Sequence, residues 1–323
     1  MLQDLIRFNL FGHEFAIHGF GVMLVIGFLC AMWLAKFLAR RKGLDGELFA
    51  NAALIGLFTG VIGARLSHVL ENLSDFTRPE RSVARNLFEM INISSGGLTY
   101  YGGFILAFPT LVIYAIKNKI PLRTGMDIIA PCLMLGLAFG RIGCFLNGCC
   151  FGAECNLPWA VEFPYGSYAY DDQVRHREID PPAELRAQTE DGTPVVYPAQ
   201  EIKKSGNQDL IRLAAAQHSK PLHPAQLYSA FTAFLLAAML VAYFTVPHTP
   251  GMVFAVMMIF EGIARFVLEL VRVEPPVMHI NGFGLSLSMV LGMWLAVFGL
   301  FLALVFHAIG ASERFATASP AAA

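Results

Sequence analysis

Hydrophobic residues along this chain fall into long blocks rather than into short alternating runs. A membrane-spanning helix needs about 20 consecutive apolar residues, and several blocks reach that length. We predict spans at residues 17–39, 48–70, 97–116, 126–147, 223–246, 251–271 and 282–307. The pattern therefore predicts an all-α polytopic membrane protein with about seven transmembrane helices.

One long polar stretch, roughly residues 152–221, separates the fourth and fifth predicted spans and is rich in Asp, Glu, Pro and Gln. Its fragments PWAVEFP and GTPVVYP suggest short strands around turns. We therefore divide the chain into four parts. These are transmembrane helices one to four (1–151), a cap (152–221), transmembrane helices five to seven (222–308), and a tail (309–323) that we expect to be cytoplasmic and disordered.

Lysine and arginine in the short loops indicate the orientation, because cytoplasmic loops carry an excess of both. Basic residues cluster after the first and third predicted spans: Lys36, Arg40, Arg41, Lys42, Lys117, Lys119 and Arg123. We therefore expect the N-terminus outside, the C-terminus in the cytoplasm, and the polar cap on the outer side.

The composition agrees with a membrane location. Of the 323 residues, 56% are hydrophobic and 15% are charged, whereas soluble domains are about one quarter charged. The mean hydropathy is +0.56. The formal net charge of -1 lacks the basic character of a nucleic-acid-binding protein, so we expect no nucleic-acid partner.

Three arginines lie near the outer ends of their predicted spans. Arg65, Arg141 and Arg265 each stand a few residues before the end of a helix that runs outward, which places them roughly 8–9 Å below the outer interface. An arginine at this depth is costly and faces the bundle interior or a polar cavity. Snorkelling to the interface is the alternative for Arg65.

The sixth predicted span carries four charged residues on one face. Glu261, Arg265, Glu269 and Arg272 follow at i, i+4, i+8 and i+11, an arc of about 80°. They can form a ladder of salt bridges. They can also leave guanidinium donors of Arg265 free for an anionic ligand such as a phosphate.

Further polar residues and glycines share this outer layer. Tyr101 begins the third span, and an interfacial aromatic belt is its alternative role. Asn147 can donate to a lipid headgroup. Glycines at these positions allow close backbone approach. The other members of the layer are His18, Tyr100, Gly102, Gly103, Gly140, Gly143, His223, Gln226, Tyr228, Asn281, Ser286 and Ser288.

The six cysteines divide into two groups. Cys30 and Cys132 lie in apolar blocks, where cysteine packs as a small hydrophobic residue. The other four, Cys144, Cys149, Cys150 and Cys155, have the spacing C-x4-C-C-x4-C. Facing an oxidising compartment, they favour one or two disulfides, with a reactive thiol as the alternative. The spacing differs from the paired cysteines of zinc sites, so we expect no metal.

Several motifs together resemble the prolipoprotein diacylglyceryl transferases of the bacterial plasma membrane. They are IHGFGVML in the first span, GARL in the second, GGLTYYGGF in the third, GRIGCFLNG in the fourth, HPAQLY in the fifth and EGIARFVLELVR in the sixth. The resemblance covers nearly every span, and the GRIG-x-F-x-NG and HP-x-QLY elements are specific.

The resemblance implies a transferase of the inner membrane that acts in lipoprotein biosynthesis. Its substrates would be phosphatidylglycerol and the lipobox cysteine of a prelipoprotein signal peptide, and glycerol phosphate would leave. It would need no metal or organic cofactor, and we expect a monomer surrounded by membrane lipids. Arg141, Arg265, Tyr101 and Glu269 would form the catalytic set. Substrate would contact Arg65, Gly102, Gly103, Gly140, Gly143, Asn147, His223, Gln226, Tyr228, Glu261 and Arg272.

The chain also departs from the family pattern. Tyr101 stands where the family commonly has His, Cys144 where it has Asn, and Cys149 where it has Glu; the other departures are Phe20, Ser229 and Phe283. A free tyrosine has a pKa near 10 and is a poor base at neutral pH, so the general base stays unassigned, with Glu269 as second choice. The alternatives are a transferase with another lipid donor or acceptor, and a non-enzymatic protein that binds or transports anionic lipids.

Overall fold

The structure is a computed structural model that describes residues 4–10, 13–77, 82–92, 97, 99–188, 193–272, 274–280 and 283–318. Asn281, which we placed in the outer layer, lies outside the described residues, as does the side chain of Tyr100. The chain divides into two compact units, one formed by residues 1–31 and 130–323 and the other by residues 32–129.

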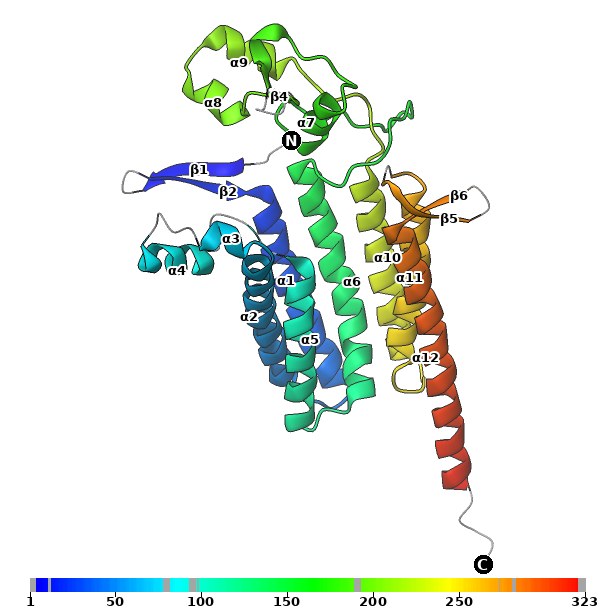
Figure 1. Ribbon diagram of the computed structural model, residues 1–323. Coiled ribbons are helices and arrows are strands. Elements are labelled where there is room, and N and C mark those ends of the chain that lie inside the picture. The colour runs from blue at the N-terminus through cyan, green and yellow to red at the C-terminus, as the bar shows by residue number, and fades with distance from the viewer. Residues whose placement is uncertain are drawn as a thin grey trace, which may run out of the picture. The chain divides into compact units, whose positions relative to one another are not determined.

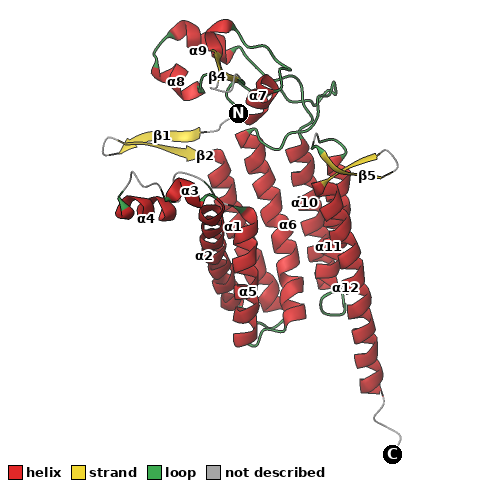
Figure 2. Cartoon of the chain, in the orientation of Figure 1, coloured by secondary structure: helices red, strands yellow, loops and turns green. Residues whose placement is uncertain are grey.

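Long helices dominate the described residues (Figure 2). They occupy each of the seven predicted ranges: α1 (Gly19–Arg41), α2 (Gly46–Glu71), α5 (Tyr100–Lys117), α6 (Leu122–Asn147), α10 (Ala225–Thr245), α11 (Met252–Glu269) and α12 (Leu287–Ala318). Five of these helices, α1, α2, α6, α10 and α12, are long and apolar enough to cross a membrane, and α5 is a shorter apolar helix. The prediction of an all-α polytopic membrane protein is confirmed.

Helix α11 is not among the five helices that are long and apolar enough to cross a membrane, because charged residues interrupt its apolar surface. Its 18 residues include Glu261, Arg265 and Glu269. The helix is nevertheless held firmly, because glycines bring it against α12. A Cβ at Gly262 would lie 2.5 Å from the carbonyl oxygen of Gly292. The two backbones therefore touch, which is the small-residue packing typical of membrane helices.

The unit of residues 32–129 is built on the pair α2 and α5, which lie side by side (Figure 1). A Cβ at Gly63 would lie 2.7 Å from Leu106, and one at Gly103 would lie 2.9 Å from the carbonyl oxygen of Gly60. Two short helices, α3 (Leu73–Phe76) and α4 (Val83–Ile91), join α2 to α5. The sequence pattern did not predict these helices because they are too short to form an apolar block.

The polar stretch between α6 and α10 folds with a small core of its own. It contains α7 (Tyr168–Arg175), η1 (Ala183–Leu185), β3 (Arg186–Gln188), β4 (Pro194–Val196), α8 (Ala199–Lys204) and α9 (Gln208–Ala215). Tyr170, Val174 and Leu185 are buried at its centre. Of the two fragments expected to form strands, GTPVVYP contains β4, whereas PWAVEFP forms only isolated bridges to residues 218 and 222.

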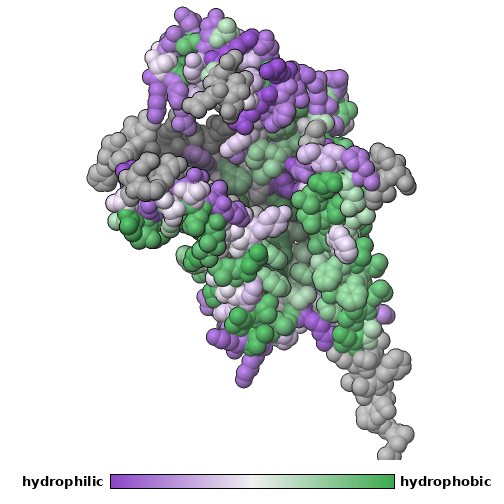
Figure 3. Space-filling model, in the orientation of Figure 1, coloured by the Kyte–Doolittle hydropathy of each residue, from purple (hydrophilic) through white to green (hydrophobic). Residues whose placement is uncertain are grey.

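Two further hairpins flank helices. Strands β1 (Asp4–Leu10) and β2 (His13–His18) precede α1, and β5 (Pro276–Ile280) and β6 (Phe283–Ser286) lie between α11 and α12. Hydrophobic side chains cover α10 to α12, whereas hydrophilic ones dominate the surface of α7 to α9 (Figure 3). This contrast fits helices that are surrounded by lipid and a cap that is surrounded by water.

Candidate functional site

The charged face of α11 belongs to a network of hydrogen bonds and ion pairs. This network extends to Glu274 in the segment that follows α11 and to Ser288 at the start of α12. The Nη2 of Arg265 donates to the Oγ of Ser288 at 2.8 Å, and this hydroxyl donates to the Oε2 of Glu274 at 2.9 Å. Arg272 pairs with the Oε1 of Glu274 at 2.8 Å and with the Oε2 of Glu269 at 3.4 Å. Of the expected salt-bridge ladder, only the pair Glu269–Arg272 is an ion pair among the described residues, and Arg272 continues it beyond the helix to Glu274.

Arg141 of α6 lies within electrostatic range of this network. Glu261 interacts with both Arg141 and Arg265, and the two arginines also act on each other. The Nε of Arg141 is buried and has no hydrogen-bond partner among the described residues. A buried guanidinium nitrogen without a partner is costly, so this atom is available to an anionic ligand.

The two glycines beside Arg141 differ in what surrounds them. A Cβ at Gly143 would lie 2.9 Å from the ring of Phe20, so this glycine lets α6 pack against α1. A Cβ at Gly140 would meet nothing within 4 Å. The space next to Gly140 is therefore open on the helix that carries Arg141.

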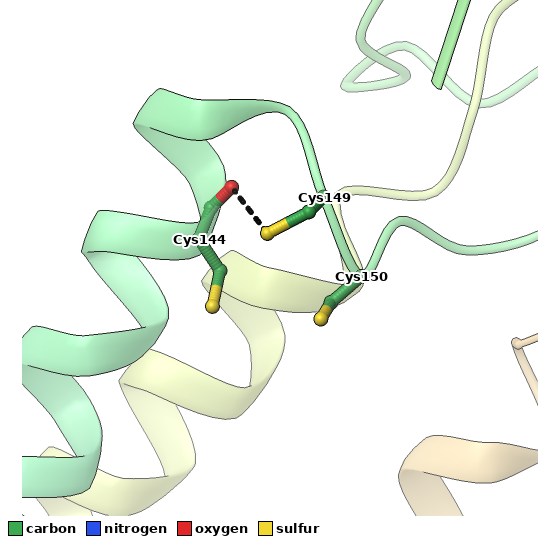
Figure 4. Close-up of side chains that lie close together, drawn as sticks. All are labelled: Cys144, Cys149 and Cys150. Atoms are coloured by element: carbon green, nitrogen blue, oxygen red, sulfur yellow. Dashed lines mark hydrogen bonds between the residues drawn. The ribbon is translucent and has the colours of Figure 1, made fainter. Parts of the chain in front are cut away.

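The chain turns sharply after α6 and carries two cysteines back toward the helix. Gly148 (φ +73°) and Cys150 (φ +59°) adopt the left-handed conformation, which is common for glycine but costs a cysteine about 1–2 kcal/mol. The thiols of Cys144, Cys149 and Cys150 all lie within 4.8 Å of one another (Figure 4). All six cysteines are free, so the disulfides expected from the sequence are absent.

The cysteine turn is anchored by the start of α10 and the end of α11. Gln226 is fully buried, and its Nε2 donates to the carbonyl oxygen of Cys149 at 2.7 Å. The backbone nitrogen of Gly152 donates to the carbonyl of His223 at 2.9 Å, and that of Ala153 donates to the carbonyl of Val271 at 2.8 Å. Gln226 therefore positions the turn.

The side chains of His223 and Tyr228 meet at the start of α10. The Nδ1 of His223 lies 3.3 Å from the Oη of Tyr228, and the indole Nε1 of Trp159 donates to the same oxygen at 2.7 Å. Trp159 was not predicted as a site residue. Nothing in its sequence surroundings marks it, since its partner lies 69 positions further along the chain.

Asn147, the last residue of α6, lines a cavity of about 710 Å³ that reaches into the cap. The other walls include His18, Gly148, Ser167, Tyr168 and Asp171. Burial raises the pKa of the Asp171 carboxyl, although the nearby Arg175 opposes the shift.

The remaining predicted site residues belong to the unit of residues 32–129. Arg65 is buried and donates to three backbone carbonyls, those of Glu89, Met90 and Gly97, at 2.7, 2.9 and 2.9 Å. It thereby holds α4 and the segment before α5 against α2. The side chain of Tyr101 is exposed. Gly102 and Gly103 face α2, so close helix packing accounts for both glycines.

Glu274 is the member of the charged network that the sequence analysis missed. It follows α11 by five residues, so the helical spacing that marked the other charges does not include it. The sequence offers one indication of its role: Glu274 stands two positions after Arg272, in the short segment between the sixth and seventh predicted spans.

Fold and site together define a class of protein. The chain is a multi-pass membrane protein in which Arg141 of α6 and Arg265 of α11 lie within electrostatic range of the same carboxyl group, that of Glu261, and in which the space beside Gly140 on α6 is open.

Comparison with known proteins narrows the class to a family. The sequence model of the family described as prolipoprotein diacylglyceryl transferase matches residues 6–305. The chain belongs to this family, and the resemblance is confirmed.

Named phosphatidylglycerol–prolipoprotein diacylglyceryl transferases are similar to the chain over different lengths. The one from Clostridium tetani is 25% identical over 92% of this chain and 95% of its own length. The one from Bordetella bronchiseptica is 28% identical over 87% and 86%. The protein from Rhodopirellula baltica is 36% identical over 51% of this chain, but this match spans only 33% of that relative.

Proposed function

We propose that this protein transfers the diacylglyceryl group of phosphatidylglycerol to the thiol of a lipobox cysteine in prelipoproteins. The observation that carries the proposal is that Arg141 and Arg265, from two different helices, both lie within electrostatic range of Glu261 and of each other in a chain of this family. Two guanidinium groups suit one phosphodiester, because each can offer paired donors to its oxygens. The names of the relatives supply the two substrates.

The reaction replaces one bond to the glyceryl carbon by another. The thiolate sulfur attacks the carbon that carries the phosphate oxygen, a carbon–sulfur bond forms, and the carbon–oxygen electron pair leaves with glycerol phosphate. The leaving phosphate gains one negative charge. Arg141 and Arg265 hold the phosphate and stabilise that charge as it develops. The proton of the thiol must go to another acceptor.

The other site residues support this arrangement. Ser288 holds Arg265 by a hydrogen bond, and Glu261 lies within electrostatic range of Arg141 and Arg265. Arg272 is fixed by the two carboxylates of Glu269 and Glu274. The open space at Gly140 accommodates part of the donor lipid. The cavity lined by Asn147 and Tyr168 receives the acceptor peptide on the side of the cap. His223 and Tyr228 offer imidazole and hydroxyl groups to the substrates, and Gln226 and Gly143 position the chain around them. In the unit of residues 32–129, Arg65, Gly102 and Gly103 hold the packing of α2 and its neighbours. The role of Tyr101 rests on the family resemblance alone.

We propose that the protein works as a monomer in the bacterial inner membrane, with the N-terminus and the cap outside and the C-terminus in the cytoplasm. The basic residues in the last turns of α1 and α5, Arg40, Arg41 and Lys117, support this orientation. The site would then face the outer leaflet, where signal peptides emerge with their lipobox cysteines.

Transfer to a synthetic lipobox peptide tests the proposal. Protein in lipid nanodiscs that contain phosphatidylglycerol should add one diacylglyceryl group to the peptide, measured by mass spectrometry, and should release glycerol phosphate. Arg141→Ala and Arg265→Ala should each lower kcat/KM by about 10²-fold or more, because each removes a charge-stabilising donor. Arg212→Ala, on the exposed surface of α9, is the matched control and should leave the rate unchanged. Full activity in both site variants would contradict the phosphate-binding role.

A further inference from the structure

Three thiols beside the arginine site have no part in the proposed transfer so far. The sulfur atoms of Cys144, Cys149 and Cys150 lie within 4.8 Å of one another, and all three side chains are half-buried. Cys144 stands one turn above Arg141 on α6, and Cys150 lies within electrostatic range of Arg141 and Arg272. The thiol cluster and the proposed phosphate site are therefore neighbours within one unit.

The grouping is held by the fold rather than by sequence spacing. C-x4-C-C is not a zinc-binding pattern, because such patterns bring two cysteines together on one short turn. Here the end of α6 supplies one sulfur and the left-handed turn at Gly148 and Cys150 returns two more. The hydrogen bond from Gln226 to the carbonyl of Cys149 fixes that turn.

We propose that Cys144, Cys149 and Cys150 bind Zn²⁺ through their three sulfurs and that the fourth coordination position takes the lipobox thiol of the acceptor. This inference rests on the proposed transferase function. Zinc bound by three protein ligands with one open position is the arrangement of catalytic zinc sites. Three sulfur ligands select a soft ion over Mg²⁺ or Ca²⁺.

The geometry and charges suit such a site. A tetrahedral site with zinc–sulfur bonds of about 2.3 Å needs sulfur–sulfur separations of roughly 3.8 Å, and the three sulfurs already lie within 4.8 Å of one another. Three thiolates and one Zn²⁺ carry a net charge of -1. Arg141 and Arg272 lie close enough to Cys150 to offset that charge.

The site would supply the missing step of the proposed reaction. A thiol that coordinates zinc loses its proton, which passes to water, and the bound sulfur keeps an electron pair that can attack carbon. The zinc-bound thiolate then forms the carbon–sulfur bond, glycerol phosphate takes the carbon–oxygen pair, and the thioether product dissociates from the metal. No side-chain base is needed at the position of Tyr101.

Cobalt substitution tests metal binding without relying on activity. The reduced, metal-free protein in nanodiscs is titrated with Co²⁺ under anaerobic conditions. We expect one equivalent to bind, with thiolate-to-cobalt charge-transfer absorption in the near ultraviolet and visible d–d bands of a four-coordinate ion. A lipobox peptide should change the d–d bands, and the same peptide with Ser in place of Cys should not. Zn²⁺ should displace the cobalt.

Serine variants test whether Co²⁺ binds to the three clustered cysteines and not to other groups nearby. Cys144→Ser, Cys149→Ser and Cys150→Ser should each lose the charge-transfer band or weaken binding by at least about tenfold. Cys155→Ser is the matched control, because this half-buried cysteine lies in the same stretch but outside the cluster. It should bind Co²⁺ like the parent. Thermal melting of every variant verifies that the chain is folded.

The outcomes distinguish this inference from the proposed function. Full transfer by metal-free protein in the presence of a chelator would overturn the zinc site and leave the transferase intact. A peptide-sensitive cobalt spectrum in a protein that never transfers lipid would support the zinc site and refute the transferase. Absence of a cobalt signal in the reduced parent, or an equal signal in all three serine variants, would refute the zinc site. A Cys144–Cys149 disulfide that reforms after reduction and excludes Co²⁺ would refute it as well.

Discussion

The arginines near the helix ends occupy similar positions in the sequence pattern, but their hydrogen bonds differ. Arg65, Arg141 and Arg265 each stand a few residues before the end of their own helix. Arg65 uses its donors on three backbone carbonyls. Arg141 instead keeps a buried Nε without a partner in the described part of the chain. We infer that Arg65 contributes mainly to stability and Arg141 mainly to ligand binding.

Arginine-to-lysine substitutions should separate these two tasks. Arg141→Lys keeps the charge but loses the planar fork, so we expect kcat/KM to fall by about 10²-fold with little change in Tm. Arg65→Lys cannot serve three carbonyls in a fork geometry, so its Tm should fall while kcat/KM of the remaining folded protein stays near that of the parent. Steady-state transfer assays and thermal melting check both. The reverse pattern would refute the assignment.

A buried carboxyl in the cap should make stability depend on pH. The pKa of Asp171 is raised by burial, and one of its oxygens has no hydrogen-bond partner among the described residues. A raised carboxyl pKa means that the protonated form stabilises the folded state. This contribution is complete below the pKa of the unfolded chain and is lost as the pH rises through the raised value.

The Asp171→Asn variant should remove this dependence. We expect its Tm to exceed that of the parent above the raised pKa and the difference to vanish in acid. Melting curves of the full protein over a range of pH measure the effect. Glu184→Gln, at an exposed position of the cap, is the control and should follow the parent. An unchanged pH profile in Asp171→Asn would contradict the role of this carboxyl.

At the level of elements, close glycine contacts hold the helix pair α11 and α12. A Cβ at Gly262 would lie 2.5 Å from the carbonyl oxygen of Gly292 and 2.7 Å from the backbone nitrogen of Ala296. Neither backbone atom can move without shifting a helix. Since Arg265 of α11 bonds to Ser288 of α12, such a shift would also disturb the proposed phosphate site.

The Gly262→Ala variant should therefore lose both stability and activity. We expect a cost of about 1–3 kcal/mol from overpacking, seen as a lower Tm, together with slower lipid transfer. Gly136→Ala on α6 is the matched control, because a Cβ there meets nothing within 4 Å. Its stability should stay the same or rise slightly, since alanine favours helix more than glycine does. Equal melting of the two variants would show that the contact is easily relieved.

For the molecule as a whole, the distribution of lysine and arginine predicts the orientation in the membrane, with the C-terminus in the cytoplasm and the cap outside. A green fluorescent protein fused to the C-terminus should fluoresce, and alkaline phosphatase inserted in the cap after Gly206 should be active. These reporters work on opposite sides of the bacterial inner membrane. Active phosphatase at the C-terminus would reverse the assignment and place the cap in the cytoplasm.

The sequence predicted the helices well because burial in lipid demands long apolar blocks, and the charged spacing on α11 follows directly from 3.6 residues per turn. The sequence pattern did not predict the contacts that depend on the path of the loops. Glu274 and Trp159 reach the site from outside the helices, and the thiol cluster depends on a left-handed turn at Cys150. The oxidising compartment favoured disulfides, and the cysteine spacing could not show that Cys149 and Cys150 turn back toward Cys144 to form a cluster of three thiols.

The charges of α11 also bear on how the chain is made. A charged side chain such as Arg or Asp in the middle of a transmembrane helix costs about 2.5–3.5 kcal/mol on the scale of translocon insertion. Helix α11 holds Glu261, Arg265 and Glu269 within 18 residues, so it is a weak insertion signal by itself. The strongly apolar α12, packed against it through glycines, can supply the missing partition energy. We therefore expect the two to leave the translocon as a hairpin during biogenesis, with the ionic contacts formed before lipid surrounds them.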